Sequence, residues 1–277
     1  MRRRTWPLRL KVVGLAALIL GLWAFWLEPA GLRVSEEHVT LRWPARSLRI
    51  AILTDLHVGS PFNGIAKLRR VVDQTNAARP DVICILGDLV IQGVLGGRFV
   101  APEEIARELN RLHAPSGTVA VLGNHDGWFD HDRVRDALEH NGIRILEDTA
   151  ARLNTPAGGV WVAGVSDLWT GRPDLDAALS AVTGDGEPVL LLTHNPDIFP
   201  QVPERVTLTL AGHTHGGQVW LPLVGRPIVP SRFGQRFAAG HVVENGRHLF
   251  VATGLGTSII PVRLLCAAGC NDSHGGV

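Results

Sequence analysis

The strongest constraint on the fold of this chain is a repeated pairing of a short, largely apolar run with a polar residue that follows it. Such runs are typical of strands buried on both faces of a sheet. Because the carboxyl ends of parallel strands meet at one edge of a sheet, we expect the polar residues to lie together there. The runs span residues 48–53, 82–86, 119–122, 189–192 and 206–210, and the polar residues that follow them are Asp55, Asp88, Asn124, His194 and His213.

The segments between the first runs carry apolar residues at helical spacing, whereas the later part of the chain is richer in strand and turn patterns. This order predicts an α/β fold, a four-layer αββα sandwich of two mixed β-sheets flanked by helices. The helical patterns cover residues 62–79, 105–112 and 134–138, and hairpins are expected at 152–165 and 241–251.

Residues 10–30 are apolar almost throughout and follow a cluster of basic residues. About 20 apolar residues suffice to cross a bilayer, so we expect one transmembrane helix. The basic flank places the N-terminus in the cytoplasm and the rest of the chain on the far side. A cleaved signal peptide is the alternative, but no small-residue cleavage site stands out near residues 25–29. Residues 3–6 also loosely resemble a twin-arginine export signal.

The charge distribution argues against nucleic acid as a partner. Five of the 27 basic residues precede residue 12, and all 26 acidic residues follow it, so the rest of the chain holds 22 basic against 26 acidic residues. A nucleic-acid-binding surface is normally basic. We therefore expect no nucleic-acid interface.

The three cysteines give little framework. Cys84 lies within an apolar run and is expected to be a core residue. Cys266 and Cys270 could pair with each other, bind a metal or remain free thiols. The segment 266–277 is small and polar, and we expect it to be a disordered tail.

The polar residues at the run ends, with two more close to them in sequence, form a set of oxygen and nitrogen donors without a thiol. Such a set suits Mn, Fe or Zn. Two such ions held side by side are a known device for in-line attack on a phosphate ester. Taken singly, each residue is a weak signal, but the complete ordered set favours a pair of divalent metal ions. The candidate ligands are Asp55, His57, Asp88, Asn124, His194, His213 and His215.

At this point the chain resembles the calcineurin-like metallophosphoesterase superfamily. The resemblance covers about residues 48–263 and is specific for the superfamily, less so for the substrate. Residues 212–218, followed by Pro222, Gly225 and Gly234, are similar to a membrane-anchored bacterial branch, some members of which act on phospholipid or nucleotide-lipid phosphodiesters. The blocks that carry the resemblance are Asp-Leu-His at 55–57, Gly-Asp at 87–88, Gly-Asn-His-Asp at 123–126, His194 and Gly-His-Thr-His at 212–215.

The resemblance implies a role for each ligand. One ion would be held by Asp55, His57, Asp88 and His215, and the second by Asp88, Asn124, His194 and His213. A hydroxide shared by both ions would attack phosphorus. His125 would face the substrate and protonate, or hydrogen-bond to, the departing oxygen.

Two features depart from the family pattern. Many relatives carry an acidic residue three positions after the bridging aspartate, where it supports the catalytic histidine, but this chain has Ile91. We then expect either that Asp126 or a backbone carbonyl orients His125, or that the contribution of His125 to the rate is diminished. The second departure is the polar C-terminal tail, where relatives usually continue into another strand.

We therefore expect a single-pass protein of the bacterial cell membrane with its catalytic domain outside the cytoplasm. Residues 1–30 would form the basic stub and anchor, 31–47 a linker or first strand, and 48–265 the metallophosphoesterase domain. The expected activity is hydrolysis of a phosphodiester or pyrophosphate, including a lipid-linked one. The alternatives are a protein Ser/Thr-type phosphomonoesterase and a non-catalytic metal-binding scaffold.

Some aromatic and basic residues are further candidates for substrate contact. The aromatic residues could line a lipid-facing groove, although packing in the core or an interface is the default role of such residues. The arginines could touch a substrate phosphate, although solvated loop positions are the default for them. These candidates are Trp128, Phe129, Trp161, Trp169 and Trp220, with Arg172, Arg226, Arg232 and Arg236.

Overall fold

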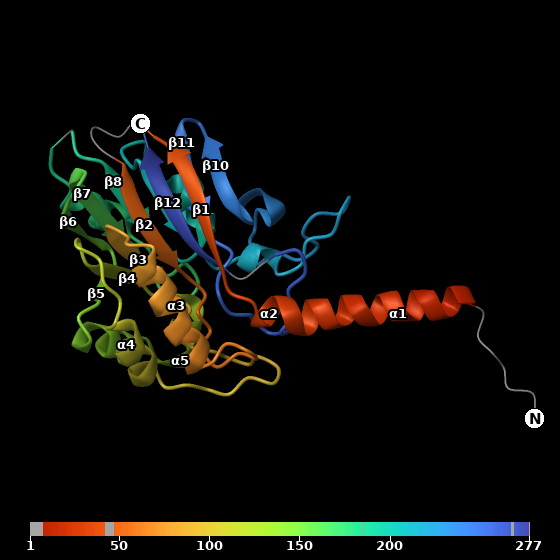
Figure 1. The fold of residues 1–277 in the computed structure, drawn as a ribbon. Helices are drawn as coiled ribbons and strands as arrows, with labels where there is room; N and C mark the ends of the chain where they lie inside the picture. The colour runs from red at the N-terminus through yellow and green to blue at the C-terminus, as the bar shows by residue number, and fades with distance from the viewer. Residues whose placement is uncertain (1–7, 42–46, 185, 267–268, 277) are drawn as a thin grey trace, which may run out of the picture.

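The computed structural model describes residues 8–41, 47–184, 186–266 and 269–276 of the chain. The basic residues Arg2, Arg3 and Arg4 of the expected stub lie outside these ranges. In the described part, two six-stranded sheets pack together, helices cover their outer faces, and one long helix projects from the domain (Figure 1).

The first sheet has the strand order β1, β12, β2, β3, β4, β5. Strands β2 to β5 are parallel to one another, whereas β12 runs antiparallel to β2. Parallel strands are joined by helical crossovers, which is why α3, α4 and α5 alternate with them along the chain. The bounds are β1 Arg33–Thr40, β2 Leu48–Leu53, β3 Val82–Leu86, β4 Thr118–Val121, β5 Arg144–Ile145 and β12 Gly269–Gly276, with α3 Ile65–Ala77, α4 Pro102–Leu109 and α5 Asn124–His140.

The second sheet has the order β10, β11, β9, β8, β7, β6. Both hairpins expected from the sequence are present, as the antiparallel pairs β6–β7 and β10–β11. The inner strands β7, β8, β9 and β11 are parallel, so this sheet is mixed, like the first. The bounds are β6 Thr149–Thr155, β7 Gly158–Gly164, β8 Val189–Leu192, β9 Leu208–Ala211, β10 Gly240–Glu244 and β11 Arg247–Val251.

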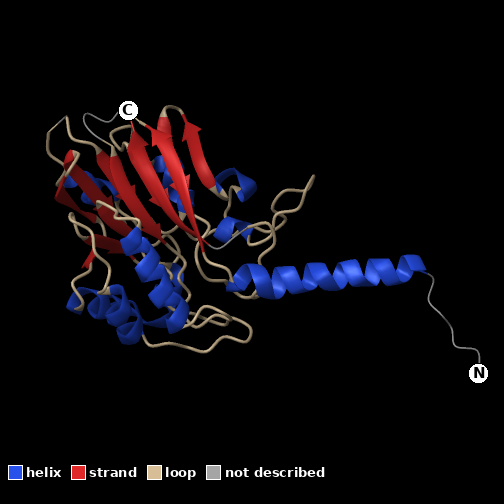
Figure 2. Cartoon of the chain, viewed as in Figure 1, coloured by secondary structure: helices blue, strands red, loops and turns tan. Residues whose placement is uncertain are grey.

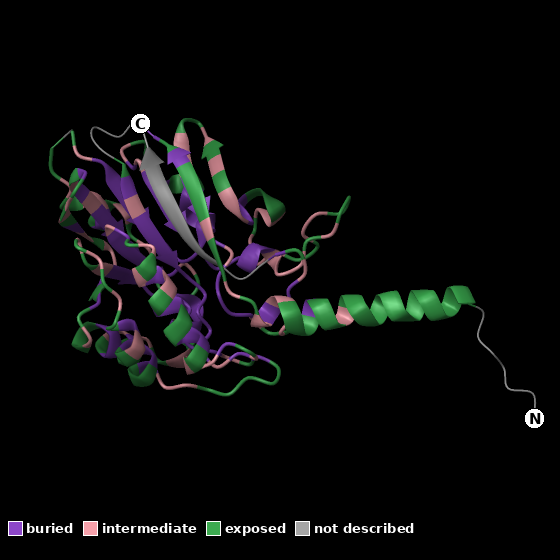
Figure 3. Cartoon of the chain, viewed as in Figure 1, coloured by how far each residue is buried: buried purple, intermediate pink, exposed green. Residues whose placement is uncertain are grey.

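Alternation of side chains along each strand creates the layers. In β2, Ile50 and Ile52 belong to the cluster between the two sheets, whereas Ala51 and Leu53 belong to the cluster under the helices. Cys84 lies in the inter-sheet cluster, as expected for a core thiol. Figure 3 shows the central strands β2, β3 and β4 among the most deeply buried parts of the molecule, whereas β1 is largely exposed. The predicted four-layer αββα sandwich is confirmed.

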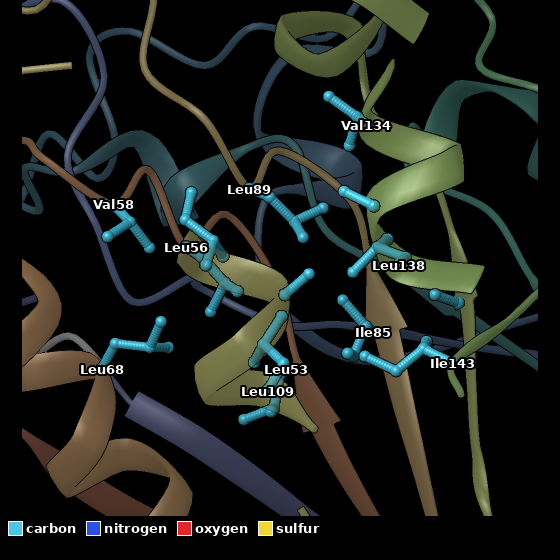
Figure 4. Close-up of a cluster of buried hydrophobic side chains, with 14 of the residues drawn as sticks. Leu53, Leu56, Val58, Leu68, Ile85, Leu89, Leu109, Val134, Leu138 and Ile143 are labelled. Carbon is cyan, nitrogen blue, oxygen red and sulfur yellow. The ribbon is translucent and has the colours of Figure 1, made fainter. Parts of the chain in front are cut away.

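The outer layers are formed by amphipathic helices. The first sheet packs against α3, α4 and α5 through residues such as Leu68, Leu109 and Leu138, which Figure 4 shows converging on Leu53 and Ile85. Figure 2 shows these helices gathered on one side of the strands. The second sheet packs against shorter elements, which are α6 Leu175–Ser180, η2 Pro196–Gln201 and η4 Gly234–Phe237.

The C-terminus differs from the disordered tail expected from the sequence. Residues Gly269–Gly276 form β12, which lies between β1 and β2 and pairs with both. Pairing in a sheet depends on backbone N–H and C=O groups, so a segment without apolar side chains can still complete a sheet. Strand β12 therefore extends the sheet beyond β2.

The long N-terminal helix carries almost no packing contacts. It runs through α1 Leu8–Leu22, the π-helical turn η1 Trp23–Leu27 and α2 Glu28–Ala30. No residue of α1 is buried (Figure 3). The stretch Leu8–Ala30 has a mean hydropathy of 2.1. Its 23 residues correspond to about 34 Å of helix, long enough to cross a bilayer. The predicted helix is therefore present and suggests membrane anchoring.

Candidate metal centre

The seven candidate ligands come together at the carboxyl ends of the strands, although they span residues 55–215 of the sequence. Five of them have positive backbone φ angles, between 38° and 70°. A positive φ is costly for a residue with a Cβ atom and persists where the surrounding structure enforces it, commonly at functional sites. These five residues are Asp55, His57, Asp88, His213 and His215.

The first group of ligands consists of Asp55, His57, Asp88 and His215. One ligand atom of each lies within 4.8 Å of the others. The Nε2 atoms of His57 and His215 are 3.1 Å apart, and His215 Nε2 is 3.3 Å from an oxygen of Asp55. All four residues are buried.

The second group consists of Asp88, His194 and His213, with Asn124 beside them. The Asn124 side-chain oxygen and His213 Nδ1 lie 3.1 Å and 3.2 Å from His194 Nε2. Asp88 belongs to both groups, because its Oδ2 lies 3.5 Å from His57 Nε2 and 3.2 Å from His194 Nε2. A carboxylate in this position can bridge two cations and offset their mutual repulsion.

The ring nitrogens fit a metal pair better than they fit one another. His57 Nδ1 and His194 Nδ1 face the backbone carbonyl oxygens of Val90 and Leu86, which only accept hydrogen bonds. In a neutral ring the Nε2 atom then keeps a lone pair directed into the site, as in metal-bound histidines. This donor set fits two divalent ions.

Burial sets most of the protonation states. It lowers the pKa of His57 and His213 to about 3 and that of His215 well below its ordinary value, so these rings are neutral. Burial also acts on His194, but the carboxylates around it, above all Asp88, outweigh it and raise the pKa to about 10. Without metal, His194 is therefore an imidazolium ion paired with Asp88.

Backbone amides hold the shared carboxylate in place. The N–H of His125 donates to Asp88 Oδ1 at 2.8 Å, which leaves Oδ2 directed toward the imidazoles. Gly123 passes so close to Asp88 and His194 that a Cβ atom at this position would collide with both side chains. The glycine in the 123–126 block is thus required by the close approach of the backbone.

Asp126 has a different role from the one expected. Its Oδ2 accepts hydrogen bonds from the N–H groups of Asp88 and Gly123, at 2.8 Å and 3.0 Å, and its Oδ1 accepts from those of Leu89 and Val90, at 2.8 Å and 3.3 Å. Both oxygens are thereby engaged by backbone amides rather than by the ring of His125. Asp126 fixes the loop that carries Asp88, which corrects the expected role in orienting His125.

The Nδ1 atom of His125 is buried and has no hydrogen-bond partner in the part of the chain described. A backbone carbonyl therefore does not orient this ring through Nδ1 either. The ring is instead positioned by edge contacts with His57 and Trp128, at centroid distances of 4.7 Å and 5.1 Å. Ile91, which replaces the acidic residue of many relatives, is buried. Aromatic packing therefore takes the place of the missing polar support.

A cavity of about 510 Å³ opens onto the ligands. Two of the five aromatic candidates, Trp128 and Trp169, line it, and the Trp169 ring lies 4.4 Å from that of His213 in an edge-on contact. Asp167, which the sequence did not single out, accepts hydrogen bonds from the N–H groups of Trp169 and Thr170 and holds this loop. Trp161 packs against the core and Phe129 contacts the ring of Phe99 at a tilted angle, whereas Trp220 is exposed outside the cavity lining.

The candidate arginines do not line this cavity among the described residues. Arg226 donates to the carbonyl oxygen of Gly216, and Arg232 and Arg236 pair with Asp197 and Glu244. Arg172 lines a separate surface pocket. None of them is placed to grip a phosphate at the ligand cluster.

Arg263 is a buried residue that the sequence analysis did not single out. Its guanidinium donates to four backbone carbonyl oxygens, those of Thr253, Gly254, Gly256 and Cys266. Gly254 lies against the side chain of Asp55 and Gly256 against that of His57, so closely that a Cβ atom on either glycine would not fit. The two terminal nitrogens of the buried guanidinium thus hold these carbonyls together and keep this loop in place. Its only signal in the sequence is a lone arginine after an apolar segment.

Comparison with known proteins agrees with this geometry. The family model for calcineurin-like phosphoesterases matches residues 48–217. The chain belongs to this family. It is therefore a metal-dependent phosphoesterase, as the sequence predicted, and its clustered Asp and His residues could bind two metal ions.

Curated relatives are similar over most of the chain. The phosphoesterase is 32% identical over 226 residues to phosphodiesterase YaeI of Escherichia coli, covering 80% of each chain. It is 28% identical over 249 residues to metallophosphoesterase YkuE of Bacillus subtilis, covering 88% of this chain and 85% of the relative. A zebrafish transmembrane protein with a metallophosphoesterase domain is 31% identical, but the match spans 50% of its length.

Among solved structures, the NAD nucleotidase of Haemophilus influenzae is similar in fold, with a TM-score of 0.50 and 14% identity. The match covers 77% of this chain and 51% of the nucleotidase. At this identity the likeness concerns the fold alone.

The ion pair of His194 and Asp88 predicts that metal uptake releases protons. At pH 7.5 His194 is protonated, because its pKa is raised to about 10, and it must lose that proton to bind a cation. Loading the metal-free protein should therefore release about one proton per chain. Calorimetric titration with Mn²⁺ in two buffers of different ionisation enthalpy measures this release. A binding heat that is the same in both buffers would contradict it, and His194→Gln should abolish the difference.

The four amides around Asp126 predict a structural effect of its substitution. Asp126→Asn replaces one acceptor oxygen by an NH₂ group, so amides of the 88–90 loop lose their partner. We expect the free energy of unfolding of the metal-free protein to fall by about 1–3 kcal/mol. Urea unfolding measures the change, with Asp132→Asn on the same helix as an exposed control. Equal stability of Asp126→Asn and the parent chain would refute this role.

Proposed function

We propose that this phosphoesterase hydrolyses a phosphodiester or pyrophosphate with two divalent ions, of Mn, Fe or Zn. The observation that carries the proposal is the Asp88 carboxylate, which lies between two groups of imidazoles at the floor of an open cavity. Two bound ions would neutralise charge on the phosphoryl oxygens and lower the pKa of water. The protein contributes the positions of the donors and the exclusion of bulk water.

In this proposal Asp55, His57, Asp88 and His215 hold one ion. The other is held by Asp88, Asn124, His194 and His213. The close nitrogen–nitrogen approaches support this division, since a cation could lie between the rings in each group.

His125 is the residue that we assign to the departing oxygen. It lines the cavity beside Asn124 without belonging to either ligand cluster. Burial lowers the pKa of His125, so its ring is neutral and acts by donating an N–H hydrogen bond rather than by carrying a charge. Such a donor stabilises the negative charge that develops on the leaving group.

The character of the cavity favours a diester over a monoester. The described residues that line it include no Lys or Arg, whereas Trp128, Trp169, Ile228 and Ile259 form apolar walls. A monoester dianion would gain from a basic residue, but the second ester group of a diester can pack on an apolar wall. The relative named phosphodiesterase YaeI supports the same choice over a Ser/Thr-type phosphomonoesterase.

We further propose that the N-terminal helix anchors the enzyme in a bacterial cell membrane as a single pass, with the catalytic domain on the extracytoplasmic side. The exposed apolar surface of α1 and the basic residues before it support this orientation. The zebrafish relative is named a transmembrane protein. Residues 1–30 would then be the anchor, and the catalytic domain would follow from 48. We include lipid-linked phosphodiesters among the substrates because of this anchor.

Substitutions of Asp88 and His125 should separate metal binding from catalysis. Asp88→Asn should lose bound metal and turnover of a bis-aryl phosphodiester together. His125→Asn should keep its metal and lose about 10²–10⁴-fold in kcat. The control His131→Asn, on the same helix but outside the cavity lining, should retain activity. Elemental analysis measures the metal content of each variant. Assays with the diester and with the corresponding monoester compare the two turnover rates.

Full diester turnover in Asp88→Asn would refute the proposal. Preference for the monoester would favour the phosphomonoesterase alternative. Two bound ions without turnover of any phosphoester would favour the metal-binding scaffold.

A further inference from the structure

Exposed apolar side chains surround the mouth of the cavity. Leu223 is fully exposed at the tip of a loop, and Ile228 and Ile259 are 78% and 68% exposed while also lining the cavity. Soluble surfaces rarely gather such residues in one place without a binding partner. We call this set the apolar rim, and it consists of Leu95, Leu223, Val224, Ile228, Ile259 and Ile260.

The three loops that carry the rim are almost without charge. Residues 89–97 and 254–262 contain no charged side chain, and 219–230 contains only Arg226. The guanidinium of Arg226 donates to the carbonyl oxygen of Gly216 at 2.6 Å, so it turns toward the domain rather than remaining free at the loop tip. The rim therefore offers no charge pattern that a water-soluble protein partner would complement.

Backbone hydrogen bonds connect these loops with one another and with the base of the N-terminal helix. The N–H of Arg263 donates to the carbonyl oxygen of Ala24 in the helix. Leu264 follows Arg263 in the chain, and its carbonyl oxygen accepts the N–H of Trp220 at 2.8 Å. The N–H of Leu95 donates to the carbonyl oxygen of Ile259. The loops that carry the rim are thus connected to the base of the helix through Arg263 and Leu264.

The helix base is fixed to the domain rather than joined by a loose linker. The Glu28 carboxylate accepts hydrogen bonds from the N–H groups of Leu265 and Cys266, and the ammonium of buried Lys67 donates to the carbonyl oxygen of Pro29. In Figure 1, α1 leaves the domain on the side toward which the loop between β9 and β10 reaches. The direction of the helix therefore sets the direction in which the rim faces.

We propose that the apolar rim lies in the surface of the bilayer that holds α1, so that the cavity opens onto the lipid headgroup region. This inference rests on the proposed membrane anchoring. A bilayer is the partner that can meet the rim and the helix at once, and it requires no charge complementarity from Leu223 or Val224. Trp23 and Trp26 lie in the turn Trp23–Leu27 at the domain end of the helix. Tryptophan is enriched at such membrane–water interfaces. The cavity then has direct access to phosphodiesters at headgroup depth.

The test uses the full chain in phosphatidylcholine vesicles, with Cys270→Ser so that only buried native thiols remain. A fluorescent probe is attached to Leu223→Cys. Its matched control is Val243→Cys, 53% exposed on β10, whose hairpin is directed away from α1 in Figure 1. Lipids that carry a nitroxide quencher near the headgroup should quench the probe at 223 about threefold more strongly than the probe at 243.

Flotation of the vesicles separates this inference from the anchoring. Floating protein whose probe at 223 is quenched no more than the probe at 243 would refute the rim contact and leave the anchor intact. That result would also be expected if the rim bound a protein instead of lipid. Protein that does not float would overturn the anchoring and the rim contact together.

Discussion

The Asp88 carboxylate is the constraint on which the rest of the site depends. It is buried at the end of β3, one oxygen accepts the N–H of His125, and the other lies between imidazoles of both ligand groups. Such a buried charge is tolerated only if it is compensated. In the metal-free protein protonated His194 compensates it, and Asp126 secures its loop through four amides. The same arrangement defines where two cations would share a ligand.

Much of the fold could be predicted from the sequence because its buried strands have a strong pattern. The apolar runs correspond to β2, β3, β4, β8 and β9, and the turn residues between 155 and 158 and between 244 and 247 mark the two hairpins. The ordered set of Asp, Asn and His residues at the run ends was sufficient to indicate which side chains meet.

The remaining features depend on tertiary contacts that leave no local pattern. The positive φ angles of Asp55 and His213 arise in the turns after buried strands. Neither residue is a glycine, so the sequence does not indicate these angles. The four amides that engage Asp126 come from two separate loops, so a pairing with the adjacent His125 looked equally reasonable. Strand β12 has no apolar alternation, since its place is set by backbone pairing with its neighbours.

The most direct test of a shared carboxylate is anomalous diffraction from crystals of the Mn²⁺-loaded protein. The account predicts two peaks about 3.5–4 Å apart, with the Asp88 carboxylate between them and contacting both. A single peak, or two peaks of which only one is contacted by Asp88, would contradict it.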